Sequence, residues 1–333
     1  MRLRVIAGSL CALAVVALTV EAWRVLTPTA ALRAGPRVVE IPPRAGLRGI
    51  AARLRRDDVI RSPAGFIALS VLRGQARRLR PGEYEFPQGA ATPAVLAQLA
   101  AGAVRQHAVL QPEGATLAEL AQTLQSARLA SARDVERAAT DPAFLRSLGV
   151  DAPSLEGYLF PDTYQFVRGM TPEEILTRLV QRLRTKLTPQ LVERAQALGL
   201  STHRLLTLAS IVEREAVVPE ERPLIAAVFW NRLAREMPLQ ADPTVQYAVR
   251  RERGTLTRAD LEVDHPYNTY RNAGLPPGPI ASPGMSSIEA VLNPAQVPYL
   301  YFVALDDRHH QFSTTLEQHN AAVARYRLTR PRG

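Results

Sequence analysis

A long apolar segment near the N-terminus constrains this chain more than any other feature. It runs from Val5 to Trp23, reads VIAGSLCALAVVALTVEAW, and follows Arg2 and Arg4. A membrane-spanning helix needs about 20 predominantly apolar residues, and arginines before such a helix favour a cytoplasmic N-terminus. We therefore expect residues 1–26 to form a cytoplasmic stub and a single transmembrane anchor in the cell inner membrane. A cleaved signal peptide is the alternative, although Val20-Glu21-Ala22 is a poor cleavage site.

The composition limits the classes of protein that remain. The chain has 333 residues, 47% of them hydrophobic, which is enough for about two domains with packed cores. Cys11 is the only cysteine, so an internal disulfide or a multi-cysteine zinc site cannot form. The histidines give no HExxH motif, and we expect neither a metal nor a cofactor. The net charge of +10 comes from arginines spread along the chain, so we expect no nucleic-acid partner.

The segment that follows the apolar stretch has the pattern of a small α+β module. Residues 27–37, with Pro28, Gly35 and Pro36, read as a tether. Residues 38–105 then predict a strand, two helices, a strand and a helix, the last one capped by Thr92. Residues 106–154 predict a helical connector that opens with a capping box. The box consists of Thr116 and Glu119. The small module has no catalytic constellation and is either a spacer or a binding module.

One helix in the C-terminal half carries two candidate acids. The helix is expected to begin after Ser201, a good N-cap, and to end before Pro219. At 100° per residue, Glu215 falls at the edge of a broad apolar arc and Glu213 on the opposite flank. A carboxyl at the edge of a buried face tends to keep its proton, which suits a general acid near neutral pH. An ordinary charge on the flank of a helix is the alternative interpretation of both glutamates.

Several further segments combine polar and aromatic residues within loops stiffened by proline and glycine. Residues 156–164 pack aromatic side chains, glycine and acids together, and residues 239–247, 267–270 and 274–284 bring Gln, Asn, Asp, Thr and Tyr. Amide and hydroxyl groups beside aromatic faces are the contacts that sugars require, and proline lowers the entropic cost of holding loop groups in place. Tight turns without a ligand are the alternative interpretation.

These segments, taken in order with residues 209–215, 229–233 and 299–304, resemble the endolytic murein transglycosylase family (MltG or YceG-like). The resemblance implies an α+β protein with an inner-membrane anchor, a LysM-like module at 38–105 and a larger mixed α+β catalytic domain at 155–330 in the periplasm. It implies a lyase that cuts the MurNAc–GlcNAc β-1,4 bond within nascent peptidoglycan strands, leaves 1,6-anhydro-MurNAc ends and terminates strand elongation. The second Glu of the family's Glu-Lys-Glu motif is Glu215 here, and Arg214 replaces the Lys.

The resemblance also implies a set of substrate-binding residues and partners. The positions that match are Asn231, Gln240, Asp242, Asn268, Tyr270, Glu156 and Tyr158. The partners are peptidoglycan glycan strands, the inner membrane and peptidoglycan synthases. Glu215 would serve first as acid and then as base, while Asp242 is the candidate second carboxylate of a hydrolase. A non-catalytic, membrane-tethered scaffold that only binds peptidoglycan is the main alternative.

Overall fold

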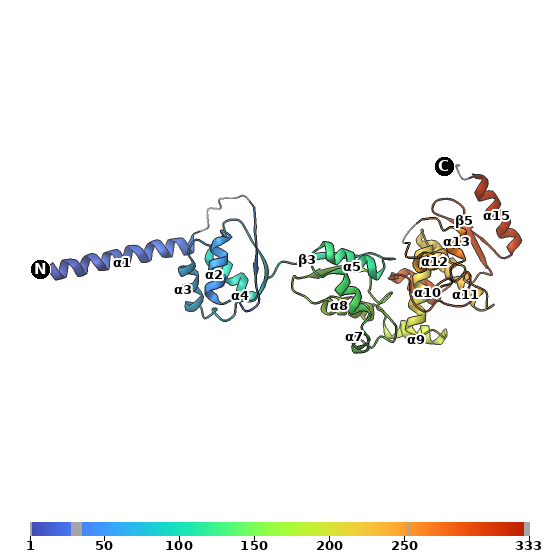
Figure 1. The fold of residues 1–333 in the computed structure, drawn as a ribbon, viewed down its shortest axis with the longest axis horizontal. Coiled ribbons are helices and arrows are strands. Elements are labelled where there is room, and N and C mark those ends of the chain that lie inside the picture. Colours follow the sequence, from blue (N-terminus) through green and yellow to red (C-terminus); the bar gives the residue numbers. More distant parts are fainter. Residues whose placement is uncertain (1, 28–34, 252–253, 330–333) are drawn as a thin grey trace. The chain divides into compact units, whose positions relative to one another are not determined.

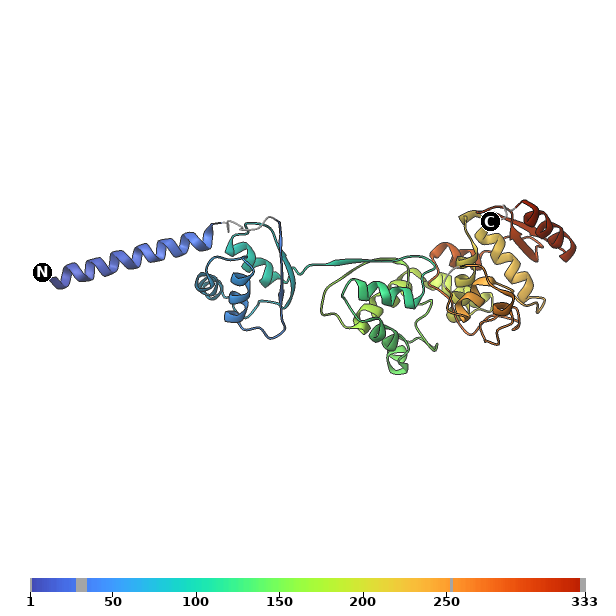
Figure 2. The same ribbon diagram turned by 45° about the horizontal axis from the view of Figure 1, so that its top comes forward.

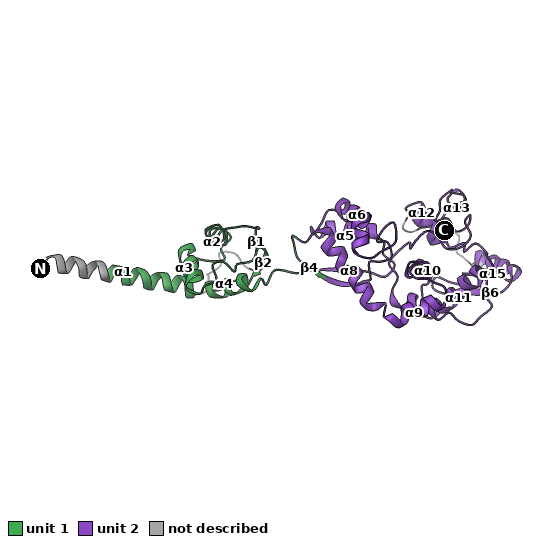
Figure 3. Cartoon of the chain, turned by 90° about the horizontal axis from the view of Figure 1, so that it is seen from below, with its two compact units in different colours: residues 1–107, 165–169 green, residues 108–164, 170–333 purple. Residues whose placement is uncertain are grey.

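The computed structural model describes residues 2–27, 35–251 and 254–329, with side chains from residue 12 onward. The chain divides into two compact units (Figure 3), the first comprising residues 1–107 and 165–169 and the second residues 108–164 and 170–333. Helices dominate both units, and the strands form two-stranded sheets that pair β1 with β2, β3 with β4 and β5 with β6. The expected mixed α+β class is confirmed.

The first unit is built around an antiparallel strand pair covered by helices. β1 (Arg37–Ile41) pairs with β2 (Gly82–Phe86), and α2 (Leu47–Arg56) and α3 (Pro63–Leu72) connect the two strands. α4 (Thr92–Ala101) follows, and the three helices lie on one side of the strand pair (Figures 1 and 2). The core contains fully buried side chains from every one of these elements, among them Ile41, Leu54, Phe66, Tyr84 and Leu96. The predicted order of strands and helices is therefore correct.

One local detail of the predicted module is wrong. The N-cap of α4 is Ala91, which makes no side-chain capping bond, and Thr92 is the first residue of the helix. Thr92 is buried, with 3% of its surface exposed, and Pro93 in the first turn supplies the fixed φ that favours helix initiation there. The helix ends at Gly102, which adopts a left-handed φ of 70°.

The expected transmembrane anchor is not found. Among the residues that the structure describes, no helix is both long and apolar enough to cross a membrane, so the predicted single-pass localisation in the inner membrane is wrong. α1 (Arg2–Leu26) is a helix, but its C-terminal turns carry charge and pack on α3. Glu21 accepts a hydrogen bond from the Ser62 hydroxyl, the Arg61 guanidinium lies 5.1 Å from the Trp23 ring centroid, and Val25 is buried. The tether expected at 27–37 falls mostly on residues 28–34, which lie outside the described residues.

The second unit begins with β3 (His107–Gln111), where a helical connector had been expected. The connector helices α5 (Leu117–Ser126), α6 (Ala132–Ala139) and α7 (Pro142–Ser147) follow this strand, and the Thr116–Glu119 capping box of α5 is confirmed. β4 (Asp162–Phe166) pairs with β3. α8 (Pro172–Lys186) has its own capping box and buries an apolar face, and α9 (Pro189–Ala197) comes next.

α10 (Thr202–Glu215) is a central helix of the C-terminal half of the second unit, where it contacts four other helices. Its N-cap is Ser201, as predicted, and residues 205–213 are all buried. α9, α11 (Arg222–Leu233), α12 (Asp242–Ala248) and α14 (Met285–Leu292) all contact it. The short η1 (Pro219–Glu221) and α13 (Arg258–Leu261) lie in the connections. The chain finishes with the antiparallel pair β5 (Tyr301–Ala304) and β6 (His310–Ser313) and with α15 (Leu316–Thr329).

A backbone exchange ties the start of the second unit to its C-terminal half. Gly114 donates to the carbonyl of Ser282, and Ser282 donates in return to the carbonyl of Ala115, both at 2.8 Å. Gly114 has a φ of 74°, a left-handed conformation that glycine adopts without strain. The Arg214 guanidinium also donates to the Gly114 carbonyl. This exchange brings residues 113–117 beside the end of α10.

Candidate active site

The two candidate acids of α10 have opposite surroundings. Glu213 pairs with Arg222 at 3.0 Å, and both side chains are about nine-tenths buried or more. The other oxygen of Glu213 accepts hydrogen bonds from the Gly284 amide and the Ser287 hydroxyl. All of its strong acceptor positions are therefore used within the fold, and Glu213 joins α10 to α11 and α14.

Glu215 has no such partners. Its side chain is half-buried at the C-terminal end of α10 and makes no hydrogen bond or ion pair with a described residue. Burial, followed by the negative charge of Asp242, raises the pKa of Glu215 to about 8, although the positive charge of Arg232 opposes both effects. A carboxyl of this kind is largely protonated at neutral pH, and its proton is not committed to another group of the protein.

Asp242 and Tyr270 form a hydrogen-bonded pair that interacts electrostatically with this carboxyl. Asp242 is the first residue of α12, and the Tyr270 hydroxyl donates a hydrogen bond of 2.6 Å to its Oδ1. Burial, followed by the hydrogen bond to Asp242, raises the pKa of Tyr270 well above its usual range, so the phenol remains a donor. The structure thus brings together three of the predicted site residues: Glu215, Asp242 and Tyr270.

Arg232 is a functional candidate that the sequence patterns did not single out. It is 7% exposed and donates to the carbonyls of Leu300, Pro238 and Leu239. Its guanidinium lies 5.2 Å from the Tyr301 ring centroid. Its positive charge lowers the pKa of Glu215 and so opposes the effects of burial and Asp242. The sequence shows Asn231 and Arg232 between bulky apolar residues. It does not show the role of Arg232, because the partners of this arginine are backbone carbonyls.

The three predicted amide residues hold loops in place around this group. Asn231 donates to the carbonyls of Val297 and Tyr299. Gln240 accepts from Arg232 and has a left-handed φ of 50°. Asn268 is fully buried, and its amide group donates to two backbone carbonyls of its own loop. Only Gln240, which is exposed, has an amide that is open to solvent.

Glu156 lies in a different pocket of the same unit. This pocket has a volume of about 500 Å³. Glu156 is 5% exposed and accepts hydrogen bonds from the Leu117 amide at the start of α5 and from the Tyr247 hydroxyl, the latter at 3.5 Å. Burial raises the pKa of Glu156 to about 7, although the Leu117 amide lowers it. The position fits a carboxylate at the positive end of a helix.

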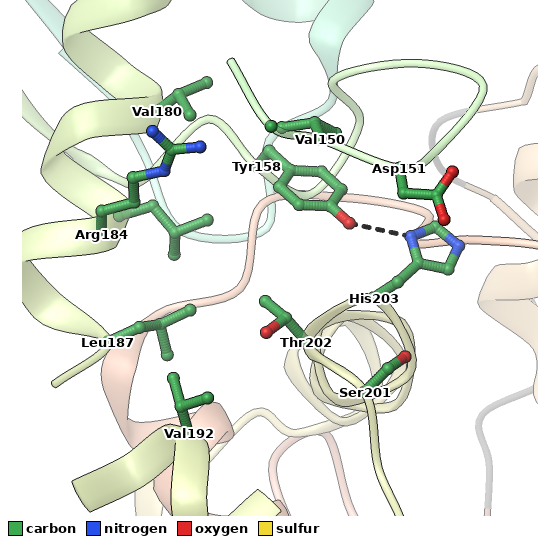
Figure 4. Close-up of a pocket in the computed structure, with 12 residues that line it drawn as sticks. Val150, Asp151, Tyr158, Val180, Arg184, Leu187, Val192, Ser201, Thr202 and His203 are labelled. Carbon is green, nitrogen blue, oxygen red and sulfur yellow. Dashed lines mark hydrogen bonds between the residues drawn. The ribbon is translucent and has the colours of Figure 1, made fainter. Parts of the chain in front are cut away.

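Tyr158 lines a third location, a pocket of about 400 Å³ next to the start of α10. Its hydroxyl faces Nδ1 of His203 at 3.0 Å (Figure 4), and Nε2 of His203 lies 2.8 Å from the Pro277 carbonyl. Since a carbonyl only accepts, neutral His203 carries its proton on Nε2 and accepts from Tyr158. Apolar side chains such as Val180, Leu187 and Val192 form the remaining wall. Tyr158 therefore supports the loop of Pro277.

No three His, Cys, Asp or Glu side chains converge in the described ranges to hold a metal ion. The arrangement around Glu215 can instead perform proton transfer through one isolated carboxyl, flanked by a carboxylate, a phenol and a guanidinium. This is the chemistry of general acid and base catalysis.

Comparison with known proteins identifies the family. A sequence model described as the YceG-like family matches residues 39–325. The chain belongs to the YceG-like family. The match includes both compact units as well as Glu215, Asp242 and Tyr270, and the expected resemblance is confirmed.

Relatives of this YceG-like chain carry functional names. It is 36% identical over 304 residues to a protein of Bacillus subtilis (strain 168) named endolytic murein transglycosylase, a match that covers 86% of this chain and 84% of the relative. A protein of Streptococcus pneumoniae serotype 2 with the same name is 34% identical over 280 residues, and 51% of its length is covered. The chain thus spans about half the length of the streptococcal relative.

A solved structure is also similar. The crystal structure of a yceG-like protein from Listeria monocytogenes is 35% identical in sequence and superposes with a TM-score of 0.61. The match covers 86% of this chain and 98% of the other. The similarity supports the fold described above for most of the YceG-like chain.

Proposed function

We propose that this protein is an endolytic murein transglycosylase, a lyase that cuts peptidoglycan strands at internal MurNAc–GlcNAc β-1,4 bonds. The observation that carries the proposal is the state of Glu215, a half-buried carboxyl with a pKa of about 8. It has no hydrogen-bond or ion-pair partner among the described residues, and Asp242, Tyr270 and Arg232 interact with it electrostatically. The names of its relatives supply the substrate class.

The proposed reaction needs one acid that then acts as a base. Protonated Glu215 donates its proton to the oxygen that bridges MurNAc and GlcNAc, and the bond between that oxygen and C1 of MurNAc breaks. The C6 hydroxyl oxygen of the same MurNAc then bonds to C1 and gives its proton to ionised Glu215. The products are a 1,6-anhydro-MurNAc end and a free GlcNAc hydroxyl, and the carboxyl returns to its starting state without consuming water.

The surroundings of Glu215 suit both steps. Asp242 makes loss of the first proton less favourable than it would otherwise be, so the acid is present at neutral pH, while Arg232 stabilises the carboxylate that forms afterwards. Asp242 is already an acceptor for Tyr270. A hydrolase would require a second carboxylate that activates water or attacks C1, and this bond to Tyr270 argues against that role for Asp242.

We also propose roles for the remaining parts of the chain. The first unit has the order strand, helix, helix, strand, which supports a LysM-like module that binds glycan and performs no chemistry. The second unit is proposed as the catalytic domain. Because residues 113–117 pack at the end of α10, a catalytic fragment has to begin near residue 108 and not near 155, where the sequence suggested. Terminating strand elongation, alongside peptidoglycan synthases, is the proposed biological role.

Mass spectrometry of digested glycan tests the proposal. The purified protein is incubated with murein strands, and the new ends are analysed. We expect anhydro ends, which are lighter than reducing ends by one water, to appear within the strands. New reducing ends would identify a hydrolase, and strands that bind but stay intact would identify a non-catalytic scaffold.

A further inference from the structure

The pocket that contains Glu156 is lined in part by the end of α10 and the start of α12, the two helices that carry Glu215 and Asp242. Arg214 and Pro243 line it, and these residues are the sequence neighbours of Glu215 and Asp242. Its volume of about 500 Å³ falls within the range of small-ligand sites. A polymeric substrate bound at Glu215 therefore has a cavity available for a further unit along the strand.

The wall of this pocket offers stacking surface. The rings of Tyr247 and Tyr267 lie 4.9 Å apart between centroids at an angle of 42°, and both side chains are half-buried pocket residues. Aromatic rings of this kind present an apolar face and a polar tip. The Tyr247 hydroxyl donates a hydrogen bond to Glu156, which fixes the orientation of the ring in the pocket wall.

The pocket is also lined by an arginine, Arg250, whose guanidinium has no hydrogen-bond or ion-pair partner in the described ranges. Arg251 pairs with Asp260 at 2.6 Å, whereas the Arg250 guanidinium makes no hydrogen bond or ion pair with a described residue. The positive charge of Arg250 acts to lower the pKa of the Tyr247 hydroxyl, so the guanidinium lies on the same side of the pocket as the Tyr247 ring.

The backbone conformation at Arg250 is unusual for a residue with a side chain. Its φ is 53°, a left-handed conformation just after the C-terminal end of α12. Glycine is the residue that usually occupies such a position, because a Cβ atom is unfavourable there. An arginine at this point costs stability, and its guanidinium makes no hydrogen bond or ion pair with a described residue that would offset the cost.

We propose that this pocket is a subsite for an N-acetylated sugar unit that carries an acidic substituent, with Tyr247 and Tyr267 stacking on the sugar and Arg250 binding the carboxylate. The inference rests on the proposed function for its ligand class. In murein the carboxylate belongs either to the lactyl group of the muramic sugar or to the peptide attached to it. Both sources present the same group to Arg250.

Binding measurements in an inactive Glu215→Gln background test the subsite without cleavage. The probes are chitotetraose, which has no carboxylate, a peptide-free murein tetrasaccharide, and the same tetrasaccharide with its peptides. We expect Arg250→Gly to weaken binding of carboxylate-bearing probes by about tenfold, since a charge-assisted hydrogen bond is lost. Binding of chitotetraose should not change. Loss for the peptide-bearing probe alone identifies the peptide as the source, and loss for both identifies the lactyl group.

Stability and a ring variant separate binding from folding. Glycine relieves the left-handed backbone, so the melting temperature of Arg250→Gly should stay the same or rise while binding falls. Tyr247→Ala should weaken all three probes, and Tyr247→Phe, which keeps the ring, should not. Arg235→Gly, which removes another exposed arginine outside the pocket, is the matched control and should bind normally.

The result that would overturn the proposal is unchanged probe binding in Arg250→Gly, or an equal loss for chitotetraose. Cutting by the wild-type protein is measured separately. If the probes bind as expected while strands remain uncut, the lyase function fails and the subsite stands. If strands are cut while the variants bind normally, the subsite fails and the lyase stands.

Discussion

Glu213 and Glu215 lie two residues apart on α10, yet Glu213 is enclosed in an ion pair with Arg222 while Glu215 has no partner in the described chain. Successive helical positions that differ by two residues point to opposite sides of the helix. One carboxylate therefore fastens α10 to α11 and α14, and the other is left to exchange a proton. Two residues of the same type therefore differ in role, one structural and one chemical, because they lie on different sides of the helix.

Replacing the free carboxyl should abolish catalysis. Glu215→Gln keeps the size of the side chain but cannot transfer a proton. General acid–base catalysis contributes about 10²–10⁴-fold, and since Glu215 acts in both steps, we expect a loss at or above the upper limit in the rate of anhydro-end formation. Circular dichroism should show a folded protein whose melting temperature is unchanged or higher, because folding at neutral pH no longer requires a carboxylate to take up a proton.

Glu220→Gln is the matched control for this variant. Glu220 lies in the nearby η1 and is exposed, so its loss should leave both rate and stability unchanged. Near-normal cutting by Glu215→Gln would show that the acid lies elsewhere, and Asp242 and Glu156 would be the next candidates.

The alkaline limit of activity should depend on Asp242. The reaction starts from protonated Glu215, whose pKa is raised to about 8, so kcat/KM should fall as the pH rises through about 8. Asp242→Asn removes a negative charge that favours the proton, which lowers the pKa of Glu215 and should move this limit to lower pH. The measurement is a pH profile of anhydro-end formation for both proteins. A profile that stays in place, or moves to higher pH, would contradict the electrostatic role of Asp242.

Breaking the enclosed ion pair should destabilise the second unit. Arg222→Met leaves the Glu213 carboxylate buried without its cation, and removing one partner of a buried pair costs about 3–5 kcal/mol. Chemical denaturation should show this loss in the free energy of unfolding, while the control Arg235→Gly should show none. Glu213→Gln should be destabilising for the same reason, so it is unsuitable as a neutral control for Glu215. A wild-type denaturation curve for Arg222→Met would contradict the structural role of the pair.

Glu156 should make the protein less stable as the pH rises. Its pKa is raised by burial to about 7 in the fold and returns to about 4.5 in the unfolded chain. The stabilising contribution is therefore complete below about pH 4 and is lost between there and pH 7, by up to about 3 kcal/mol at 1.36 kcal/mol per pKa unit. Glu156→Gln should remove this pH dependence from the unfolding free energy. An identical pH dependence in the variant would assign the effect to other groups.

The local parts of this fold were predictable because their signals lie within a few residues. Ser201 begins α10 and Thr116 with Glu119 begins α5, since a hydroxyl before an apolar run satisfies free amides of the first turn. A pattern of the same local kind placed Glu215 at the edge of an apolar face, and the family resemblance then singled it out from Glu213. These features need no knowledge of the tertiary structure.

The remaining parts depend on partners that are distant in sequence or that are backbone atoms. Arg232 binds the carbonyls of residues 238, 239 and 300, and carbonyls have no residue type that a pattern can detect. The same is true of Glu156, whose partner is the amide of Leu117. α1 was predicted as a membrane anchor because the hydropathy of a segment says nothing about its tertiary contacts. In the structure the C-terminal part of α1 packs on α3, where Glu21 accepts a hydrogen bond from Ser62 and Val25 is buried.

The exchange between Gly114 and Ser282 has a consequence for how the chain acquires its structure. The amide of Gly114 leaves the ribosome early, but the carbonyl that it bonds is made only after most of the second unit has been synthesised. Contacts of such long sequence separation carry the largest cost of loop closure and form late in folding. Gly114 and Ala115 therefore lack these two bonds while α5 to α13 are produced, and the surroundings of Glu215 are completed only when the segment around residue 282 arrives. The nascent chain thus has its acid in place long before it has the site that gives the acid its reactivity.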